Sequence, residues 1–438
     1  MVRKMAQETF EKFFEKLEGE NKENNFKQTE IGLIPEDWEV VRLGEVFKEV
    51  NKKERKIKIE ENRIYRLVHT KLYAQGVELK EEKKGKQIKA DYMFIVKQGD
   101  FIFSKINAKK GAFGIISSNL DGAVVTSEHP ILITNERKAF NYFVFYYLSQ
   151  PKVWDEFEKH SIGFAGKSRI KVPGFLSVKI PLPPLEEQRK IVRVLDKIQQ
   201  AIELQDRIIE QAKRLKKSLM QKLFTEGLYG EEQKETEIGL IPKSWEVVRL
   251  EEIGKIITGN TPSKRKKEYW ENGEIDFIKP PDLKNSYITT FSEKISLKAK
   301  DKARIVPEKS ILVSCIGIIG RVGYTLKPVA FNQQINAIIP FSDKIDSLFL
   351  FFALQTQVKQ IESMKSATTV PIVNKAKFSH VKIPLPSLEE QKQIAHILST
   401  IDRKIEVEQK RKQVLKELFK TMLHKLMSGE IRLKVVEI

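Results

Sequence analysis

The sequence predicts an α+β protein built from two copies of one module, each followed by a long helix. Two repeated stretches support this reading: residues 178–224 return at 381–427, and residues 29–45 return at 236–252. Between these stretches, short apolar runs alternate with Gly and Pro, a pattern typical of strands, turns and short helices. The interiors of the two modules differ far more than their borders, so we expect the two copies to share a fold but to carry different residues inside it.

The repeated stretch predicts a long amphipathic helix of about 38 residues in each copy. Its apolar residues step by four, three and four positions, which is the a/d seam along which one helix winds against another. Because the copies form a two-fold repeat, we expect an antiparallel coiled coil. The seam residues expected to face each other are Ile191, Leu195, Ile198 and Ile202 with Ile394, Leu398, Ile401 and Ile405.

Both helices have similar start signals and the same polar interruption of the seam. Proline runs precede them, and Ser387 with Glu390 predicts a capping box for the second helix. The next seam position is polar in both copies, Gln205 and Glu408. The alternative is two unrelated surface helices, each packed on its own domain. The matched polar interruption favours the paired helices. We expect this pair to act as a spacer. Four residues inserted after Phe224 would then lengthen the spacer.

The order of the repeated segments is circularly permuted. A short amphipathic helix with Phe10, Phe13 and Phe14 precedes the first module at nearly the distance by which the end of the first long helix precedes the second. The expected segments are an N-terminal helix at 1–28 that completes the repeat, a first domain at 29–178, a spacer helix at 179–227, a linker at 228–235, a second domain at 236–381, a second spacer helix at 382–428 and a tail at 429–438.

Composition favours a polyanion as partner. The formal net charge is +19, and nucleic acid is the usual counterpart of such a surplus. A lysine-rich, thermophilic proteome is the alternative source of this charge. The single cysteine, Cys315, excludes an internal disulfide and fits a reducing cytosol. No apolar run is long enough to span a bilayer, and the charged N-terminus lacks a signal-peptide core, so we expect a cytoplasmic protein.

Several enzyme signatures are incomplete in this chain. Ala165–Ser168 (AGKS) lacks the first glycine of a P-loop, and Lys279–Leu283 (KPPDL) lacks the aromatic residue of a base-flipping methyltransferase. The six histidines show no zinc-ligand spacing. Cys315 has no evident catalytic partner and is expected to be a small buried side chain. We therefore expect a protein without catalytic activity, cofactor or metal.

The combination of IPLPPLEEQRKIV and IPLPSLEEQKQIA with GLIPEDWEVVRL and GLIPKSWEVVRL resembles the specificity (S) subunit of Type I restriction-modification systems. The resemblance covers essentially the whole chain. It implies that the two modules are target recognition domains, each reading one half of a split double-stranded DNA sequence. It also implies that the paired helices set the distance between the halves and dock two methylase subunits, and that a restriction subunit can join.

Candidate DNA-binding residues follow from what base edges and phosphates accept: Arg or Lys for guanine, Asn or Gln for adenine, and Lys for phosphate. In the first module they are Lys83, Lys84, Lys86, Lys105, Asn107, Lys109, Lys110, Lys167 and Arg169. In the second module they are Lys264, Arg265, Lys266, Lys267, Arg321, Gln333, Gln334, Lys365, Thr368 and Thr369. Each cation could equally be a solvated surface charge, and the two glutamines could instead satisfy core backbone groups.

Two other functions compete with this reading. A tandem-repeat scaffold for protein interaction would share the repeat and the helices but would not bind duplex DNA in a salt-sensitive way. A fused methyltransferase-specificity enzyme is disfavoured by the missing catalytic motifs.

Overall fold

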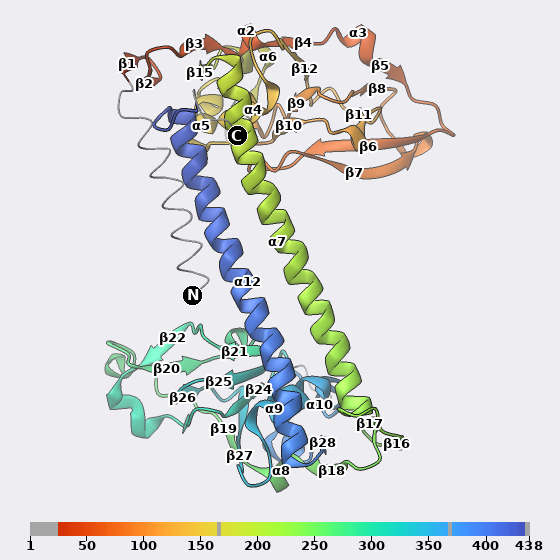
Figure 1. Ribbon diagram of the computed structural model, residues 1–438, viewed down its shortest axis with the longest axis vertical. Helices are drawn as coiled ribbons and strands as arrows, with labels where there is room; N and C mark the ends of the chain where they lie inside the picture. Colours follow the sequence, from red (N-terminus) through yellow and green to blue (C-terminus); the bar gives the residue numbers. More distant parts are fainter. Residues whose placement is uncertain (1–24, 164–167, 367–369, 434–438) are drawn as a thin grey trace. The chain divides into compact units, whose positions relative to one another are not determined.

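The computed structural model describes residues 25–163, 168–366 and 370–433, which form two compact units (Figure 1). The first unit comprises the chain up to Leu204 together with the part from Lys412 onward, and the second unit comprises Gln205–Arg411. This division cuts both long helices, α7 (Leu185–Glu226) and α12 (Leu388–Ser428), so each unit contains one half of each helix. The expected N-terminal helix lies outside the described residues.

The described strands of the first unit form two larger sheets, ordered β10-β9-β12-β4 and β5-β8-β11-β6-β7, and the pairs β1-β2, β3-β15 and β13-β14. The strands are β1 (Phe26–Thr29), β2 (Gly32–Pro35), β3 (Glu39–Arg42), β4 (Phe47–Glu49), β5 (Lys56–Lys58), β6 (Ile64–Thr70), β7 (Val77–Lys84), β8 (Tyr92–Ile95), β9 (Phe101–Phe103), β10 (Phe113–Ile115), β11 (Val124–Val125), β12 (Ile131–Thr134), β13 (Ser161–Ile162), β14 (Arg169–Ile170) and β15 (Lys179–Leu182). The short helices are α2 (Leu43–Val46), α3 (Lys52–Arg55), α4 (Asn141–Leu148), α5 (Pro151–Lys159) and α6 (Val172–Leu176), with 3-10 turns η1 (Gly85–Gln87), η2 (Ala108–Lys110) and η3 (Ser118–Leu120).

The second unit repeats this plan with sheets ordered β19-β27-β24-β25-β21 and β22-β20-β26-β23 and the pairs β16-β17 and β18-β28. Its strands are β16 (Gln233–Thr236), β17 (Gly239–Pro242), β18 (Glu246–Arg249), β19 (Gly254–Thr258), β20 (Ile275–Ile278), β21 (Ser286–Ile288), β22 (Glu293–Ile295), β23 (Ile305–Val306), β24 (Ile311–Ser314), β25 (Val322–Thr325), β26 (Val329–Phe331), β27 (Ile335–Pro340) and β28 (Lys382–Leu385). The short helices are α8 (Leu250–Ile253), α9 (Ser347–Thr356), α10 (Val358–Ser363) and α11 (Lys375–Ser379), with 3-10 turns η4 (Lys267–Tyr269), η5 (Pro280–Asp282) and η6 (Leu297–Lys302).

The repeated TEIGLIP and tryptophan segments close each unit in the same way. β3 pairs with β15 in the first unit, and β18 pairs with β28 in the second, both antiparallel. Trp38 and Trp245 are buried, and their indole N–H groups donate to carboxylates at the starts of the long helices. Trp38 Nε1 lies 3.2 Å from Glu187 Oε2, and Trp245 Nε1 lies 3.0 Å from Glu390 Oε2.

The start of α12 departs in part from the expected capping box. The Ser387 hydroxyl accepts a hydrogen bond from the backbone N–H of Glu390 (3.3 Å), as a cap should. The Glu390 carboxylate, however, does not complete the box; it accepts from Trp245 Nε1 and from the backbone N–H of Leu228 (3.1 Å). A buried indole donor needs a partner, so this carboxylate joins the helix to the domain core.

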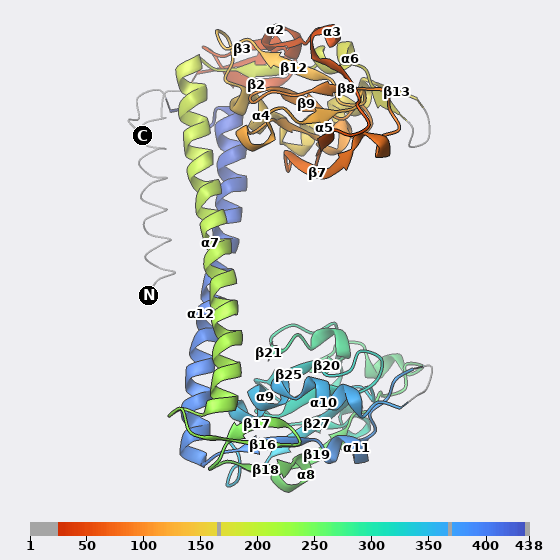
Figure 2. The same cartoon turned by 90° about the vertical axis from the view of Figure 1, so that its right-hand side faces the viewer.

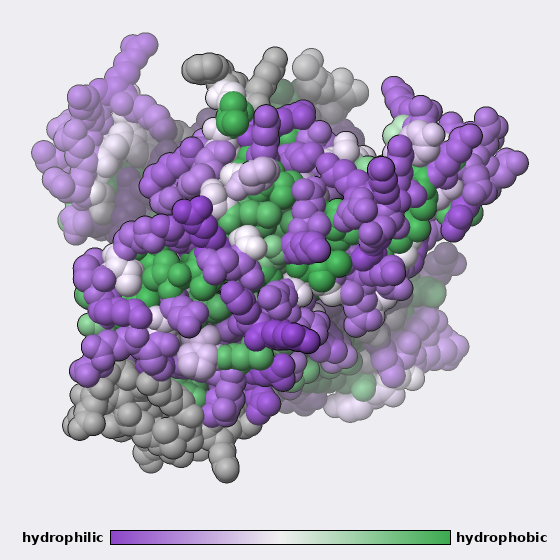
Figure 3. Space-filling model, turned by 90° about the horizontal axis from the view of Figure 1, so that it is seen from above, coloured by the Kyte–Doolittle hydropathy of each residue, from purple (hydrophilic) through white to green (hydrophobic). Residues whose placement is uncertain are grey.

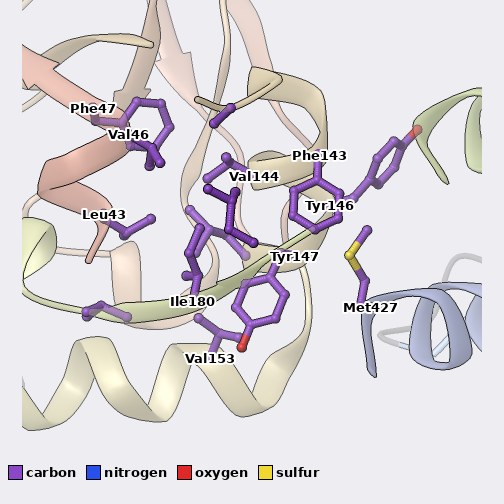
Figure 4. Packing of buried hydrophobic residues seen from close by; sticks show 14 of the residues in the cluster. Leu43, Val46, Phe47, Phe143, Val144, Tyr146, Tyr147, Val153, Ile180 and Met427 are labelled. Carbon is purple, nitrogen blue, oxygen red and sulfur yellow. The ribbon is translucent and has the colours of Figure 1, made fainter. Parts of the chain in front are cut away.

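In each unit, the first half of one long helix packs beside the second half of the other. Ile191 and Leu195 of α7 share a hydrophobic cluster with Met422 and Leu426 of α12 in the first unit. Figures 1 and 2 show these two half-helices side by side, and Figure 4 shows Met427 of α12 among the core side chains of that unit. The second unit mirrors this arrangement, with Ile394, Leu398, Leu223 and Phe224 in one cluster.

The antiparallel coiled coil is confirmed, but the expected facing of the two seam sets is wrong. Ile191 and Leu195 belong to the cluster of the first unit, whereas Ile394 and Leu398 belong to that of the second. The physical reason is the antiparallel direction itself, because equivalent residues of two antiparallel helices come together only where the pair has its two-fold axis. The helices are slightly longer than expected, at 42 and 41 residues.

The polar interruption of the seam marks that two-fold point. Gln205 and Glu408 occupy equivalent positions in the two copies, both are buried, and Gln205 Nε2 donates to Glu408 Oε2 (2.5 Å). Arg411 Nη1 also donates to Glu408, at 2.9 Å from Oε1. Each polar side chain thereby satisfies the other inside an otherwise apolar seam. The circularly permuted repeat thus has a defined centre at this pair.

Glycine ends both long helices. Gly227 and Gly429 follow α7 and α12 with φ angles of 68° and 76°, the left-handed conformation that favours glycine at a helix C-terminus. A Cβ atom at Gly429 would also collide with the Pro35 ring. After Gly429 the chain continues into the first core, where Arg432 is buried. The expected tail is therefore an integral part of the first unit as far as Leu433.

Candidate nucleic-acid interface

Three loops of the first unit meet where β9 ends and β12 begins. They are residues 104–107, residues 126–130 and the strand β14. The backbone N–H of Lys105 donates to the Glu128 carbonyl (3.0 Å), and the backbone N–H of Ile170 donates to the Lys105 carbonyl (2.8 Å). These bonds fix the backbones of the three loops against one another. We call this surface the first three-loop edge.

The second unit builds an equivalent surface where β24 ends and β27 begins. The backbone N–H of Cys315 donates to the Gln334 carbonyl (2.8 Å), and that of Val373 donates to the Cys315 carbonyl (2.8 Å). Lys105 therefore corresponds to Cys315, and Ile170 to Val373. Residues 315–317, 332–334 and 372–373 form the second three-loop edge.

Cations gather on the first edge. Lys105 Nζ donates to the Ser127 carbonyl (2.7 Å), and Arg169 Nη1 donates to Glu128 Oε1 (3.1 Å). Lys109 Nζ donates to Ser168 Oγ (2.5 Å) and Glu158 Oε1 (2.9 Å). The Lys109 side chain is 14% exposed, whereas that of Arg169 is 56% exposed. Arg169 is thus the more accessible of these two cations.

Amide side chains lie on the second edge. Gln333 is exposed, and its Oε1 accepts from Thr261 Oγ1 (2.5 Å). Gln334 Oε1 accepts from Asn332 Nδ2 (3.0 Å). Both glutamine side chains therefore bond to neighbouring polar side chains at the edge, instead of to the core backbone groups that the sequence left open as an alternative. The two edges share a backbone arrangement and differ in chemistry.

Asn107 belongs to the first edge, and the other candidates lie on neighbouring or separate segments or carry other contacts. Lys83 and Lys84 are on β7 and Lys86 is on η1, and Lys83 pairs with Glu81 (2.9 Å). In the second unit Lys264 lies over the Trp270 ring and Lys266 over the Tyr269 ring. The remaining described candidates lie on η2 or beside it (Asn107, Lys110), on the segment from 264 to η4 (Arg265, Lys267), after Gly320 (Arg321) and after α10 (Lys365). Lys167, Thr368 and Thr369 are outside the described residues.

Polar atoms without partners accompany the first edge. Among the described residues, Glu128 Oε2, His129 Nδ1 and His69 Nδ1 are buried and have no hydrogen-bond partner. Burial, with a smaller effect of the neighbouring His69, lowers the pKa of His129 to about 4. The imidazole therefore stays neutral at pH 7. Such groups at a surface edge are candidates for contact with a ligand or water.

Sequence reasoning missed Glu128, Thr261 and Asn332, because it searched for groups that bind DNA and passed over those that hold such groups in place. The available signal was the position of Thr126–Pro130, which precedes a strand just as Asn332–Gln334 does. Cys315 is buried as expected, and burial raises the pKa of its thiol to about 12.

No group of His, Cys, Asp and Glu side chains within the described part of the chain is arranged to hold a metal ion. The described helices also include none that combines the length and apolarity needed to cross a membrane. The face visible in Figure 3 is largely hydrophilic, with smaller hydrophobic patches between the polar side chains.

Comparison with known proteins places the fold and the repeat in one family. A family model described as the Type I restriction modification DNA specificity domain matches residues 35–214 and 242–417. The provisionally named MjaX type I restriction enzyme specificity subunit of Methanocaldococcus jannaschii is 32% identical over 426 residues, covering 94% of this chain and 98% of that protein. The MjaVIII specificity subunit of the same organism is 31% identical, covering 94% and 97%.

Solved structures show the same fold. The S subunit of a Type I restriction-modification system from M. genitalium superposes with a TM-score of 0.58 at 17% identity, covering 92% of this chain and 97% of that one. Two matched domains, two long antiparallel helices and relatives of this similarity along nearly the full length lead to one conclusion. The chain belongs to the family of Type I restriction-modification DNA specificity subunits.

Proposed function

We propose that the two three-loop edges are the surfaces through which this specificity subunit binds duplex DNA, one half-site at each target recognition domain. The observation that carries the proposal is the pair of matched backbone hydrogen bonds that builds the same edge in both units. A common backbone with different side chains is what two readers of different half-sites require. The subunit has no catalytic activity itself; it supplies the DNA specificity of a complex.

The net charge of +19 supports a polyanionic ligand, and on the first edge Lys105 and Arg169 place cations beside polar side chains. Lysine contacts to phosphate give affinity, while contacts to base edges give sequence preference. The cytoplasm, where the DNA lies and where Cys315 would stay reduced, is the proposed location.

Variants with equal charge at different places test the DNA surface. Lys105→Gln removes one cation from the first edge, and Lys83→Gln removes one from β7, which is not one of the edge segments. We expect Lys105→Gln to weaken binding of the reconstituted complex to DNA and to lower the slope of log affinity against log salt by about one. Lys83→Gln should leave both quantities near the wild-type values. Equal losses of DNA affinity in the two variants would show that the edge contributes to binding only through the net charge of the protein.

The partners proposed beyond DNA are two methylase subunits that dock on the long helices, with a restriction subunit joining the assembly. Specificity subunits of type I systems assemble with other subunits, and each helix offers an exposed apolar side chain at an equivalent position. Leu204 is 53% exposed and Val407 is 43% exposed.

A pair of aspartate variants tests this docking. Leu204→Asp with Val407→Asp should abolish co-purification of the methylase subunits, because a charge in an apolar contact is costly. Leu33→Asp with Leu240→Asp, at equivalent exposed sites on β2 and β17, is the matched control. Loss of co-purification in both pairs, or in neither, would contradict docking at the helix positions. A scaffold without DNA readout would keep co-purification and lack salt-sensitive DNA binding.

A further inference from the structure

We infer that Arg169 reads a guanine in the half-site bound by the first domain and that Glu128 is the positioning residue that orients it. The inference rests on the proposed function and specifies its chemistry at one position. The second domain has no cation at the equivalent place and presents the amides of Gln333 and Gln334 near it. The two half-sites should therefore differ in the base recognised at corresponding positions.

The backbone holds Arg169 at the edge without help from its side chain. Arg169 pairs with Ile162 in the β13-β14 ladder, and the next residue, Ile170, donates its N–H to Lys105. The Arg169 side chain is 56% exposed, and its guanidinium uses one Nη1 donor on Glu128. A guanidinium carries five N–H donors in a planar fork, so the bond to Glu128 leaves a pair of donors for a further acceptor.

Glu128 is placed to orient this fork. Its carbonyl accepts from Lys105, its Oε1 accepts from Arg169, and its Oε2 is buried, with no hydrogen-bond partner among the described residues. Because Oε2 is enclosed, Glu128 does not itself present an acceptor to a base. An ion pair this exposed adds little to stability, so orientation of Arg169 is the consequence that matters.

The second domain provides an internal comparison at the same backbone positions. Val373 corresponds to Ile170, so Ile372 stands where the first domain has Arg169, and Gln334 stands where it has Glu128. The cation–carboxylate pair is thus replaced by an aliphatic side chain and an amide. Since the backbones match, this exchange changes what the edge can recognise and leaves its shape alone.

The hydrogen-bonding groups of the bases predict which base each of the two edges recognises. In the major groove guanine offers the acceptors O6 and N7, which match an arginine fork, whereas adenine offers N7 and an N6 donor, which match an amide. One such bidentate contact discriminates against the wrong base by roughly 5- to 150-fold. The first half-site should therefore contain a guanine whose N7 contributes to affinity through Arg169.

The experiment uses the full chain reconstituted with its methylase subunits. Sequencing of methylated DNA first gives the recognised motif. Each guanine of the first half-site, on either strand, is then replaced by 7-deazaguanine, which lacks the N7 acceptor and keeps base pairing. We expect one position at which this replacement weakens wild-type binding by about 5-fold or more. Arg169→Gln should bind natural DNA more weakly and lose sensitivity at that position alone.

Two further variants distinguish base recognition by Arg169 from an effect of net charge and from a loss of folding. Arg169→Lys keeps the charge without the fork, so it should keep the salt dependence and lose the discrimination. Glu128→Gln should bind mixed-sequence DNA more tightly, because a carboxylate is removed, while its sensitivity to 7-deazaguanine falls. A merely structural role for Glu128 would not produce this opposite pair of changes. Thermal unfolding confirms that each variant is folded.

The outcomes distinguish this inference from the proposed function. If the wild-type complex binds DNA without salt sensitivity or sequence preference, the proposed function fails. If it binds specifically but the first half-site contains no guanine, Arg169 is not a guanine reader. Unchanged 7-deazaguanine sensitivity in Arg169→Gln would overturn the inference in the same way.

Discussion

Arg432 is a buried cation that joins the end of the described chain to the first core. Its guanidinium donates to Glu187 Oε2 (2.7 Å) and to Asp37 Oδ1 (2.8 Å), and it lies over the Trp38 ring. These carboxylates raise its pKa further above the ordinary arginine value, although burial acts in the opposite direction. Only the fold brings these groups together, because they stand far apart in the sequence.

Arg432→Met should lower the free energy of unfolding by about 3–5 kcal/mol, because it leaves the Glu187 carboxylate buried without its cation. Urea unfolding followed by tryptophan fluorescence measures the change. Lys382→Met, which breaks the exposed pair with Glu237, is the control and should cost less than about 1 kcal/mol. Equal losses of unfolding free energy in the two variants would show that burial does not make the ion pairs of Arg432 more stabilising than an exposed pair.

His129 should make stability fall in mild acid. Its pKa is about 4 in the folded protein, below the ordinary 6.5, so the unfolded chain takes up the proton first as pH decreases. The contribution of the neutral imidazole is complete above pH 6.5 and is lost toward pH 4, and the part lost by pH 5 amounts to about 2 kcal/mol. Wild type should therefore lose more stability between pH 7.5 and 5 than His129→Asn. Parallel pH profiles of the two proteins would contradict this.

Part of the candidate site could be predicted residue by residue from the sequence. Lys105 and Arg169 could be selected because cations that follow strands and glycine loops suit DNA. Glu128 could not, because its link to Arg169 depends on hydrogen bonds between loops 41 residues apart in sequence. Contact between these cations and DNA stays a prediction.

The long helices were the most predictable elements, because a seam of apolar residues over many turns has few other interpretations. Their facing was mispredicted because the sequence repeat was read as direct pairing. The contact between Gln205 and Glu408 gives the correct relation: residues at equal distances from this pair, on opposite sides, come together. The sequence repeat shows that the two helices are similar. Only their relative direction determines which turns of one helix contact which turns of the other.

Replacing this polar pair tests its role within the second unit. Glu408→Leu alone should cost about 1–3 kcal/mol, since it leaves the Gln205 amide buried without that acceptor. Gln205→Leu with Glu408→Leu should restore or exceed wild-type stability, because a packed apolar pair replaces buried polar groups. Urea unfolding of these two variants, of Gln205→Leu alone and of the wild type forms a double-mutant cycle. Additive changes would mean that the two side chains act independently.

At the scale of the whole molecule, both long helices are anchored twice. The first half of α7 and the second half of α12 pack in the core of the first unit, and the other halves pack in the second. An insertion after Phe224 is therefore not the mild change that the sequence suggested. Phe224 stacks on Phe349 (5.3 Å between centroids), and the turn just beyond it bonds to Glu390.

Lengthening should succeed only when both helices change together. Seven residues inserted after Arg207 and seven after Lys410, at equivalent positions, preserve the heptad seam and add about 10.5 Å, or about three base-pair steps. The recognised half-sites should keep their bases and accept a longer gap, measured by sequencing methylated DNA. Either insertion alone should destabilise the protein instead. An unchanged gap in an active doubly inserted complex would show that the helices do not set the spacing.

The pairing of Gln205 with Glu408 also limits how such a chain can arise from a single half. In a dimer of two identical halves, the residue at the two-fold point meets its own copy. Two glutamines can satisfy each other there, whereas two buried glutamates would repel. An unlike pair becomes available only after the halves are joined in one gene and can mutate separately. Residue 408 is thus a position where joining two halves in one chain permits a side chain that a symmetric dimer of identical halves would disfavour.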